Sequence, residues 1–351
     1  MISRRSALPA ALLAALAAGA VPRPACAEMW LTAVVPAPGA SSLPAPTPTP
    51  AKKGKPAPKG KATAKAPAPA TQPEGPAVVT GDSGIVELTN GSQFPAAQSA
   101  IKPERIDRTF LRFGAARPMP LTGAREDGTV TKLDATYAGA GLATLGVTLA
   151  PQAGQMDGPT FEAYLKDIGA DDAAADRLKK KETKKAGKEV ALRSAKTFVS
   201  AWDPKGLVKP FAEGRTGAEP LGMPMEIVLS ENPMDLHAGG VAHTTLLMET
   251  KPLANQPVKI FHEDKSPPET LRTGADGKLD VPLTKPGRVL LAAAAIRRTQ
   301  KADKKKGDAY KNADWESFAT SLQLTVGAAA PVAPTPTPTP AKKKKAAAKK
   351  N

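Results

Sequence analysis

The fold is decided by residues 273–295, TGADGKLDVPLTKPGRVLLAAAA. The pair Asp276-Gly277 is a strong signal for a tight turn between paired strands. The strand predicted after it has apolar residues at alternate positions, the period of a half-buried strand: Leu279, Val281 and Leu283. Pro286-Gly287 turns the chain again, and residues 289–295 are continuously apolar, which is typical of a strand covered on both faces. We therefore predict a hairpin inside a folded β-domain, with no spacing typical of catalysis or ligand binding.

Apolar segments on both sides of this stretch predict two β-domains. Four short segments separated by turn signals make up the first: residues 85–88, 109–113, 129–133 and 142–149. Four further segments surround the opening stretch in the second: residues 225–229, 241–248, 258–261 and 321–326. Near the end of the second domain, Trp315 and Phe318 of the segment DWESF are predicted to anchor the charged loop 301–308.

Between the two β-domains the apolar period changes to that of helices. Pro159 follows Asp157-Gly158 as a first helical residue, and apolar side chains recur at helical spacing from Phe161 to Ile168. Residues 171–181 begin with acids and end with lysines, which matches the helix dipole. Residues 188–202 also place apolar side chains on one helical face. The sequence therefore predicts a mainly β protein with a helical insert (α+β).

The formal net charge of +16 is concentrated outside the predicted domains. Residues 37–77 hold six lysines against Glu74, residues 328–351 hold six lysines and no acid, and three arginines lie in residues 1–27. The remaining sequence carries about +2, so no nucleic-acid-binding fold is expected. Because the Pro/Lys/Ala-rich residues 37–77 have no large apolar residue after Leu43, we predict that they are disordered or polyproline-like. Residues 328–351 are nearly a copy of this segment, and the same prediction holds for them.

The first 27 residues have the pattern of a secretory signal peptide. Two arginines precede an apolar run, and Ala25-Cys26-Ala27 forms a cleavage site before Glu28. The run is too short and too rich in alanine for a good membrane anchor, so no span is expected after cleavage. Ser3-Arg4-Arg5 leaves the twin-arginine route open beside the general secretory route. Cleavage would remove the only cysteine, which excludes disulfides, thiolate metal sites and cysteine nucleophiles from the mature chain.

Three histidines are the candidate metal ligands: His237, His243 and His262. With nearby methionines, among them Met223 and Met248, they could form a soft nickel or copper site. The competing interpretation is that the methionines fill the core and the histidines lie on the surface. No nucleophile elbow, phosphate loop or calcium loop is present, so we predict that the protein is not an enzyme.

Two charged regions have a functional and a plain interpretation. The lysines of residues 179–188 could bind an anion, or they could be a solvated helix end, which we favour. The basic segments could meet an anionic envelope polymer or lipid through salt-sensitive attraction. They could also be spacers kept soluble by their charge.

Several short stretches, taken together, carry a resemblance to a known family. They are residues 28–31 (EMWL), 161–166 (FEAYLK), 220–224 (PLGMP), Asp276-Gly277, 286–288 (PGR) and 313–318 (ADWESF). With them the chain resembles exported bacterial proteins of a domain-of-unknown-function family that includes the NikM-like proteins named for nickel uptake. The resemblance implies two Ig-like or transthyretin-like β-sandwiches, a periplasmic location and a role in transition-metal uptake or binding.

The chain departs from that family at two positions. Many members have a histidine just before the residues that match EMWL, where this chain has Ala27. Many also have one a few residues after the Pro-Gly-Arg turn, where this chain has residues 292–295, all alanine. If those histidines bind metal in the family, this chain has lost that site.

These observations predict the following organisation: a signal peptide (1–27), a first strand (28–36), a disordered linker (37–77), a first β-domain (78–152), a helical insert (153–206), a connection (207–221), a second β-sandwich (222–327) and a disordered basic tail (328–351). The expected function is that of a periplasmic, non-enzymatic accessory or scaffold protein whose basic segments engage an envelope protein or anionic polymer. The alternative is a nickel- or copper-binding protein or chaperone.

Overall fold

The computed structural model describes residues 28–34, 78–80, 83–113, 116–137, 141–202 and 219–329. The predictions made for the signal peptide, for the linker up to residue 77 and for residues 330–351 lie outside the described residues. No helix in the described part of the chain is long and apolar enough to cross a membrane.

The described residues are mainly strands, joined by two α-helices and four short 3-10 helices. The strands are β1 (Glu28–Val34), β2 (Val78–Thr80), β3 (Ser83–Gly91), β4 (Ile106–Phe113), β5 (Thr122–Asp127), β6 (Val130–Thr136), β7 (Gly141–Leu149), β8 (Gln152–Met156), β9 (Gly187–Trp202), β10 (Met225–Leu229), β11 (Val241–Met248), β12 (Lys251–Pro252), β13 (Pro257–His262), β14 (Glu269–Arg272), β15 (Lys278–Pro282), β16 (Gly287–Arg298) and β17 (Trp315–Val326). The helices are α1 (Gly158–Asp167), α2 (Asp171–Lys179), η1 (Pro103–Arg105), η2 (Pro233–Asp235), η3 (Asp303–Lys305) and η4 (Asp308–Tyr310).

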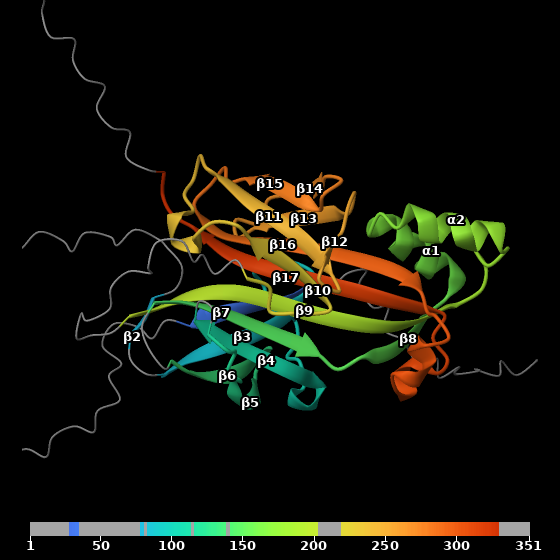
Figure 1. The fold of residues 1–351 in the computed structure, drawn as a ribbon, viewed down its shortest axis with the longest axis horizontal. Coiled ribbons are helices and arrows are strands. Elements are labelled where there is room, and N and C mark those ends of the chain that lie inside the picture. The colour runs from blue at the N-terminus through green and yellow to red at the C-terminus, as the bar shows by residue number, and fades with distance from the viewer. Residues whose placement is uncertain are drawn as a thin grey trace, which may run out of the picture.

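These strands form three sheets. The central sheet has nine strands in the order β14-β13-β16-β17-β9-β7-β4, with β2 and β8 also paired to β9. The N-terminal sheet has the order β1-β3-β6-β5, and the C-terminal sheet contains β10, β11, β12 and β15. In Figure 1, β9 and β17 run along the length of the molecule between β3, β5 and β6 on one side and β11 and β15 on the other.

The two small sheets pack on opposite faces of the central sheet. Successive side chains of a strand point to opposite faces. On β17, Phe318 and Leu322 belong to the core shared with the C-terminal sheet. The alternate residue Gln323 accepts a hydrogen bond of 3.0 Å from Thr32 of β1, and Ser321 donates one to the carbonyl of Met29. The fold is therefore a β-sandwich of three layers in which β9 and β17 are covered on both faces.

The prediction that residues 289–295 form a strand covered on both faces is confirmed. Val289 and Leu291 of β16 lie in the core shared with the C-terminal sheet. Leu290, between them, packs with Trp30 and Phe94 on the opposite face. A continuous apolar run is needed here because both faces of the strand exclude water.

The predicted hairpin is wrong in one respect, because its two strands do not pair. β15 pairs with β11 in the C-terminal sheet, whereas β16 pairs with β13 and β17 in the central sheet. Leu279 and Val281 of β15 still face the same core as Leu291 of β16. The alternating pattern thus reports which core a strand borders, and not which strand it pairs with.

The helical insert is confirmed for α1 and α2, but the predicted helix over residues 188–202 is wrong. Asp157 caps α1, accepting a 2.9 Å hydrogen bond from the N–H of Thr160. Residues 187–202 instead form β9, the longest strand. Ala195 of β9 faces the core toward the N-terminal sheet and Phe198 faces the opposite core. Apolar residues on both faces blur the period of two, which is why the segment resembles a helix.

Strands from both predicted β-domains join the central sheet. β4 and β7 come from the predicted first domain, and β13, β16 and β17 come from the predicted second. β9 links the two groups, since it pairs with β7 on one side and with β17 on the other. The predicted division into two domains stays a prediction.

Candidate functional site

The three predicted histidine ligands lie in three different surroundings. His243, on the outer face of β11, is 56% exposed, and its Nδ1 lies 2.7 Å from the Asp280 carboxylate. This hydrogen bond raises the pKa of His243. His237 lies in the turn before β11, where its Nδ1 is 2.8 Å from its own loop's carbonyl at Asp235. His262 is buried at the end of β13.

The histidines are not brought together. His262 is paired with Val289 of β16, and β16 separates it from β17. His237 bridges to Gly327, just beyond β17. His237 therefore lies beside the end of β17, whereas His262 lies in the strand on the far side of β16. The described residues contain no group of three or more His, Cys, Asp or Glu side chains that could hold a metal ion.

The methionines near these histidines fill core space. Met225 is fully buried among the apolar residues between the C-terminal and central sheets. Met223 packs with Phe110 and Leu221 in a smaller cluster. The packing of these methionine side chains in the core therefore explains their presence without a metal.

A buried carboxylate, Glu226 of β10, organises the segment before it. Both of its oxygens lie 2.9 Å from the N–H of Leu221, and the N–H groups of Gly222 and Met223 donate at 3.1 and 3.4 Å. Gly222 has a positive φ of 74°, which lets the chain curl around the carboxylate. Successive backbone N–H groups of this kind form a concave anion site. The stretch PLGMP, one of those that carry the family resemblance, is thus a loop folded around Glu226.

The partner of Glu226 is a lysine with no exposed surface. Lys196 Nζ of β9 lies 2.8 Å from Glu226 Oε1, and the two side chains are 0% and 1% exposed. Burial lowers the pKa of Lys196, and the carboxylate of Glu226 opposes this. Arg112, also buried, donates to the carbonyls of Pro220 and Glu219 on the same loop. The pair therefore fastens the loop and β10 to the central sheet.

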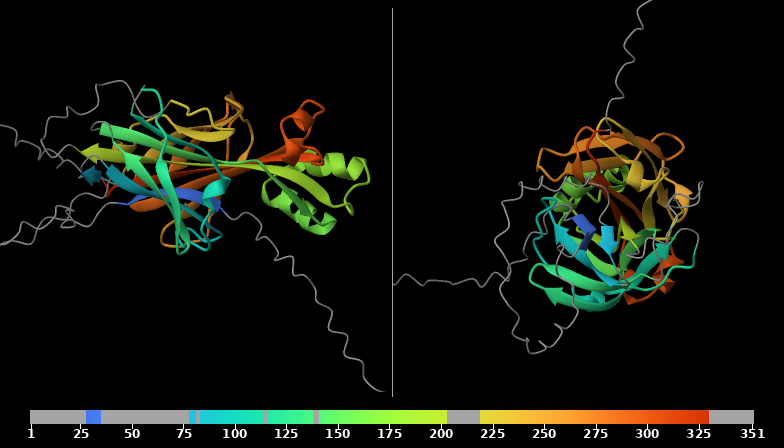
Figure 2. Two further views of the ribbon diagram at one scale, coloured as in Figure 1. Left: turned by 90° about the horizontal axis from the view of Figure 1, so that it is seen from below. Right: turned by 90° about the vertical axis from the view of Figure 1, so that its left-hand side faces the viewer.

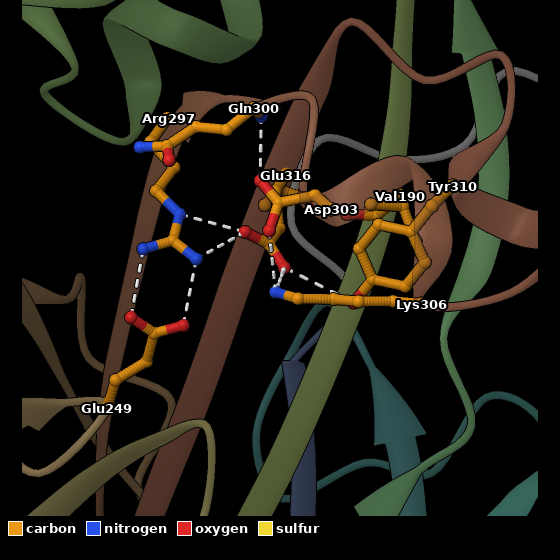
Figure 3. Close-up of polar contacts among 9 residues, drawn as sticks. Val190, Glu249, Arg297, Gln300, Asp303, Lys306, Tyr310 and Glu316 are labelled. Carbon is orange, nitrogen blue, oxygen red and sulfur yellow. Dashed lines mark hydrogen bonds and ion pairs between the residues drawn. The ribbon is translucent and has the colours of Figure 1, made fainter.

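A second buried carboxylate, Glu316 of β17, joins four segments (Figure 3). Arg297 of β16 donates to it from Nε at 2.8 Å and from Nη2 at 2.6 Å. The hydroxyl of Tyr310 lies 3.2 Å away and Lys306 Nζ lies 3.4 Å away. Arg297 also forms a bidentate pair with Glu249, at 2.8 and 2.9 Å.

Two partners of Glu316 have a further carboxylate partner of their own, Glu249 for Arg297 and Asp303 for Lys306. The hydrogen bonds to Glu249 raise the pKa of Arg297, and those to Asp303 raise the pKa of Lys306. Burial raises the pKa of Tyr310. These groups are therefore held in their protonated forms at neutral pH, and none is poised to transfer a proton.

Arginines also attach the helices to the end of the central sheet. Arg298 of β16 lies 4.2 Å over the ring of Trp315 and pairs with Asp176 at 2.7 Å and with Glu182. Trp315 packs against Phe161 of α1, with ring centroids 5.8 Å apart. Trp315 is an anchor, as predicted, but it holds the helices. The segment 300–313 is instead held by Tyr310, which packs with Val190.

A cavity of about 450 Å³ lies where the N-terminal sheet meets the edge of the central sheet. Three basic residues line it, Lys102, Arg105 and Arg193, together with amide and hydroxyl side chains. Its lining has no carboxylate, imidazole or thiol, the groups that most often serve as general acids or bases. The polar and basic lining suits a small polar or anionic molecule.

Glu28, the first residue of β1, lies near Arg193, one of the basic residues that line this cavity. Its burial raises its pKa to about 7, although Arg193 and Lys259 act in the opposite direction. The α1 carboxylate Asp167, which pairs with Lys259 at 2.7 Å, adds to the rise. Glu28 therefore titrates near neutral pH.

The buried ion pairs were not predicted from the sequence. Glu226 sits in the apolar run MEIVL, Lys196 sits in a segment interpreted as a helix, and Glu316 sits in DWESF. A charged residue within an apolar strand was the available signal, because such a residue is rarely buried without a partner. The partner itself could not be found, since Lys196 and Glu226 lie in different sheets.

Among the solved structures that are similar to this chain are a domain of intimin and PorU. The D0-D1 domain of intimin matches at 11% identity over 72% of this chain and 96% of that chain, with a TM-score of 0.16. Dimeric latent PorU from Porphyromonas gingivalis matches at 9% identity over 74% of this chain and 19% of that chain, with a TM-score of 0.17. Scores this low carry no argument about function.

No curated protein matches the chain. A family model matches residues 102–297, which run from the segment before β4 to the end of β16. That range includes Lys196, Glu226 and the loop between them. This chain belongs to the family described as "Domain of unknown function (DUF4198)".

Proposed function

We propose that this protein is an exported, non-enzymatic accessory or scaffold protein of the bacterial envelope, whose Lys-rich segments engage anionic envelope components. The observation that carries the proposal is where those segments join the folded part. Residues 35–77 follow Val34 of β1 and precede Val78 of β2, and residues 330–351 follow the strand that ends at Val326.

These junctions lie at one end of the molecule. Val78 pairs with Ser200, near the end of β9, and β17 runs parallel to β9 toward the same end. The hydrogen bond between Thr32 and Gln323 shows that β1 ends there as well. The helices α1 and α2 lie at the opposite end (Figure 2). Both basic segments can therefore reach a single anionic surface at the same time, which adds their attractions.

Two further observations support the proposal. β1 begins at Glu28, the residue that follows the predicted cleavage site. The buried residues Lys196, Glu226 and Glu316 form ion pairs inside the fold, as a scaffold needs. The proposal includes two β-sandwich units sharing β9 and β17, and descent from metal-uptake-associated NikM-like proteins.

The proposal is tested by changing charge while keeping length. In one variant the six lysines of residues 37–77 and the six of residues 328–351 are replaced by glutamine. In the matched control the same twelve lysines become arginine, which keeps the charge. We expect the arginine variant to stay with the envelope as the wild-type chain does, and the glutamine variant to be released into the soluble periplasmic fraction at a lower salt concentration. Unchanged fractionation of the glutamine variant would contradict the proposal.

A further inference from the structure

The end of the molecule that bears the helices is basic in its own right. We call residues 171–188 and 298–314 the basic cap; they hold thirteen Lys and Arg against seven Asp and Glu. The two parts are in contact, since Arg298 pairs with Asp176 and the N–H of Asp314 donates to the carbonyl of Lys188 at 2.8 Å. Figure 2 shows the helices and the segment before β17 together at this end.

The cap contrasts with the rest of the folded sequence. Outside the leader, the linker and the tail, the sequence carries about +2. Because the cap alone carries +6, the remainder is about −4. Charge is therefore unevenly distributed over the folded part. Its positive end lies opposite the junctions of the Lys-rich segments. A field of this kind orients a protein on a charged surface.

Most acids of the cap are already neutralised within it. Asp176 and Glu182 pair with Arg298, Asp303 pairs with Lys306, and Asp308 pairs with Lys311. Seven exposed lysines form no ion pair with other described residues: Lys179, Lys181, Lys184, Lys185, Lys188, Lys301 and Lys305. These ammonium groups are available to an external anion.

An exposed leucine lies among these lysines. Leu178, in the last turn of α2, is 69% exposed, the highest value among the large apolar side chains of the described residues. Lys179 follows it in the chain, Lys181 comes three residues after it, and both lysines are exposed. The exposed acids Asp171 and Asp172 lie at the other end of α2, about 10 Å away at 1.5 Å per residue. A soluble polyanion has no use for Leu178, whereas a bilayer surface accepts both a lysine cluster and an apolar side chain.

We propose that the basic cap docks on a bilayer surface containing anionic phospholipids, with Leu178 entering the headgroup region and the free lysines around it pairing with lipid phosphates. This surface is separate from the Lys-rich segments of the proposed function. Together the two would let the protein span two anionic surfaces, one at each end.

A label at the cap tests this directly. The chain from Glu28 onward has no cysteine, so Leu178→Cys gives a single site for an environment-sensitive fluorophore. The background carries the twelve Lys→Gln changes in the Lys-rich segments, so that only the cap can respond. We expect a blue shift with vesicles containing phosphatidylglycerol, none with pure phosphatidylcholine vesicles, and loss of the shift at high salt.

Two matched variants sharpen the test. Lys179→Ala, Lys181→Ala and Lys184→Ala together should weaken the vesicle titration on the order of a hundredfold. The control removes three exposed lysines elsewhere, Lys102, Lys251 and Lys265, and should leave the titration unchanged. The proposal is overturned if the label at residue 178 does not respond, or if the control weakens binding equally. It is also overturned if a label at Ala124→Cys, on exposed β5, shifts as much, or if soluble polyphosphate gives the same shift as the vesicles.

Discussion

Glu226 of the C-terminal sheet and Glu316 of the central sheet are both buried carboxylates, yet they are held in different ways. Glu226 accepts hydrogen bonds from the backbone of its own loop and has one charged partner, Lys196. Glu316 is held by the side chains Arg297, Lys306 and Tyr310, and two of these have another carboxylate to bind. Among the described residues, Lys196 therefore has no other carboxylate to pair with if Glu226 is lost, whereas the cationic partners of Glu316 do.

The comparison shows that burial alone does not set how much a charge matters to stability. Removing one member of a closed buried pair leaves the other charge without compensation, whereas a network redistributes its contacts. The closed pair of Lys196 and Glu226 should therefore be the most sensitive point of the fold.

The largest effect is expected from Glu226→Gln. It removes the charge that compensates Lys196 and should lower the free energy of unfolding by about 3–5 kcal/mol. Urea denaturation followed by circular dichroism measures it. The double variant Glu226→Gln, Lys196→Met removes both charges and should recover most of the loss. A double variant no more stable than Glu226→Gln would show that the pair is not closed.

A smaller loss, about 1–3 kcal/mol, is expected from Glu316→Gln. Arg297 keeps Glu249 and Lys306 keeps Asp303, so neither cation is left alone. Because the network is redundant, Glu249→Gln alone should lower the free energy of unfolding only a little. Glu249→Gln and Glu316→Gln together should lower it by more than the sum of the two single losses. Strictly additive losses in the same urea experiments would argue against a shared network.

A third carboxylate, Glu28, extends the comparison. Here the effect of burial on the pKa is larger than the opposite effect of the cationic neighbours. Its pKa in the folded state, about 7, is raised above the usual 4.5. The folded state therefore binds the proton more tightly than the unfolded state between these values, so stability should fall as pH rises from about 4.5 to 7. Each unit of pKa difference corresponds to about 1.4 kcal/mol.

Glu28→Gln should flatten this part of the pH profile of the urea midpoint. Glu87→Gln, at a β3 carboxylate, is a control that should keep the slope. If the slope in the wild-type chain is absent, or survives in Glu28→Gln, burial does not govern this carboxylate.

The smallest effect is expected from the histidines. Because the three lie apart, substitutions at His237 and His262 should leave calorimetric titrations with nickel, copper and zinc unchanged. Any weak binding should be lost in His243→Ala, since His243 has both Asp280 and Glu231 nearby. A strong site that requires all three histidines would revive the metal-binding alternative.

Patterns with a single cause were predicted well from the sequence. The apolar run of β16 predicted a strand covered on both faces, and the Asp157-Gly158-Pro159 start predicted α1, because each depends on local chemistry. β9 was interpreted as a helix because apolar residues on both faces hide its period of two. β16 is also covered on both faces, but it was predicted correctly as a strand because its run has no charged residue between Val289 and Ala295.

The candidate sites were predicted less well, because they depend on contacts between distant residues. Lys196 and Glu226 meet across two sheets, and Arg297 meets Glu316 through strand register. Histidine and methionine content suggested a metal site, but proximity in the sequence did not bring the three histidines together in the fold. The basic cap was interpreted as a solvated helix end, and the exposure of Leu178 became visible only once α2 was placed.

The central claim is that the Lys-rich segments are enough to hold a protein at the envelope. The most direct measurement joins residues 37–77 and 328–351 to an unrelated exported carrier protein and follows its fractionation at low and high salt. The account predicts that the carrier moves to the envelope fraction at low salt and is released at high salt, while a carrier bearing the same segments with glutamine in place of lysine stays soluble. A carrier that stays soluble with the native segments would contradict the claim.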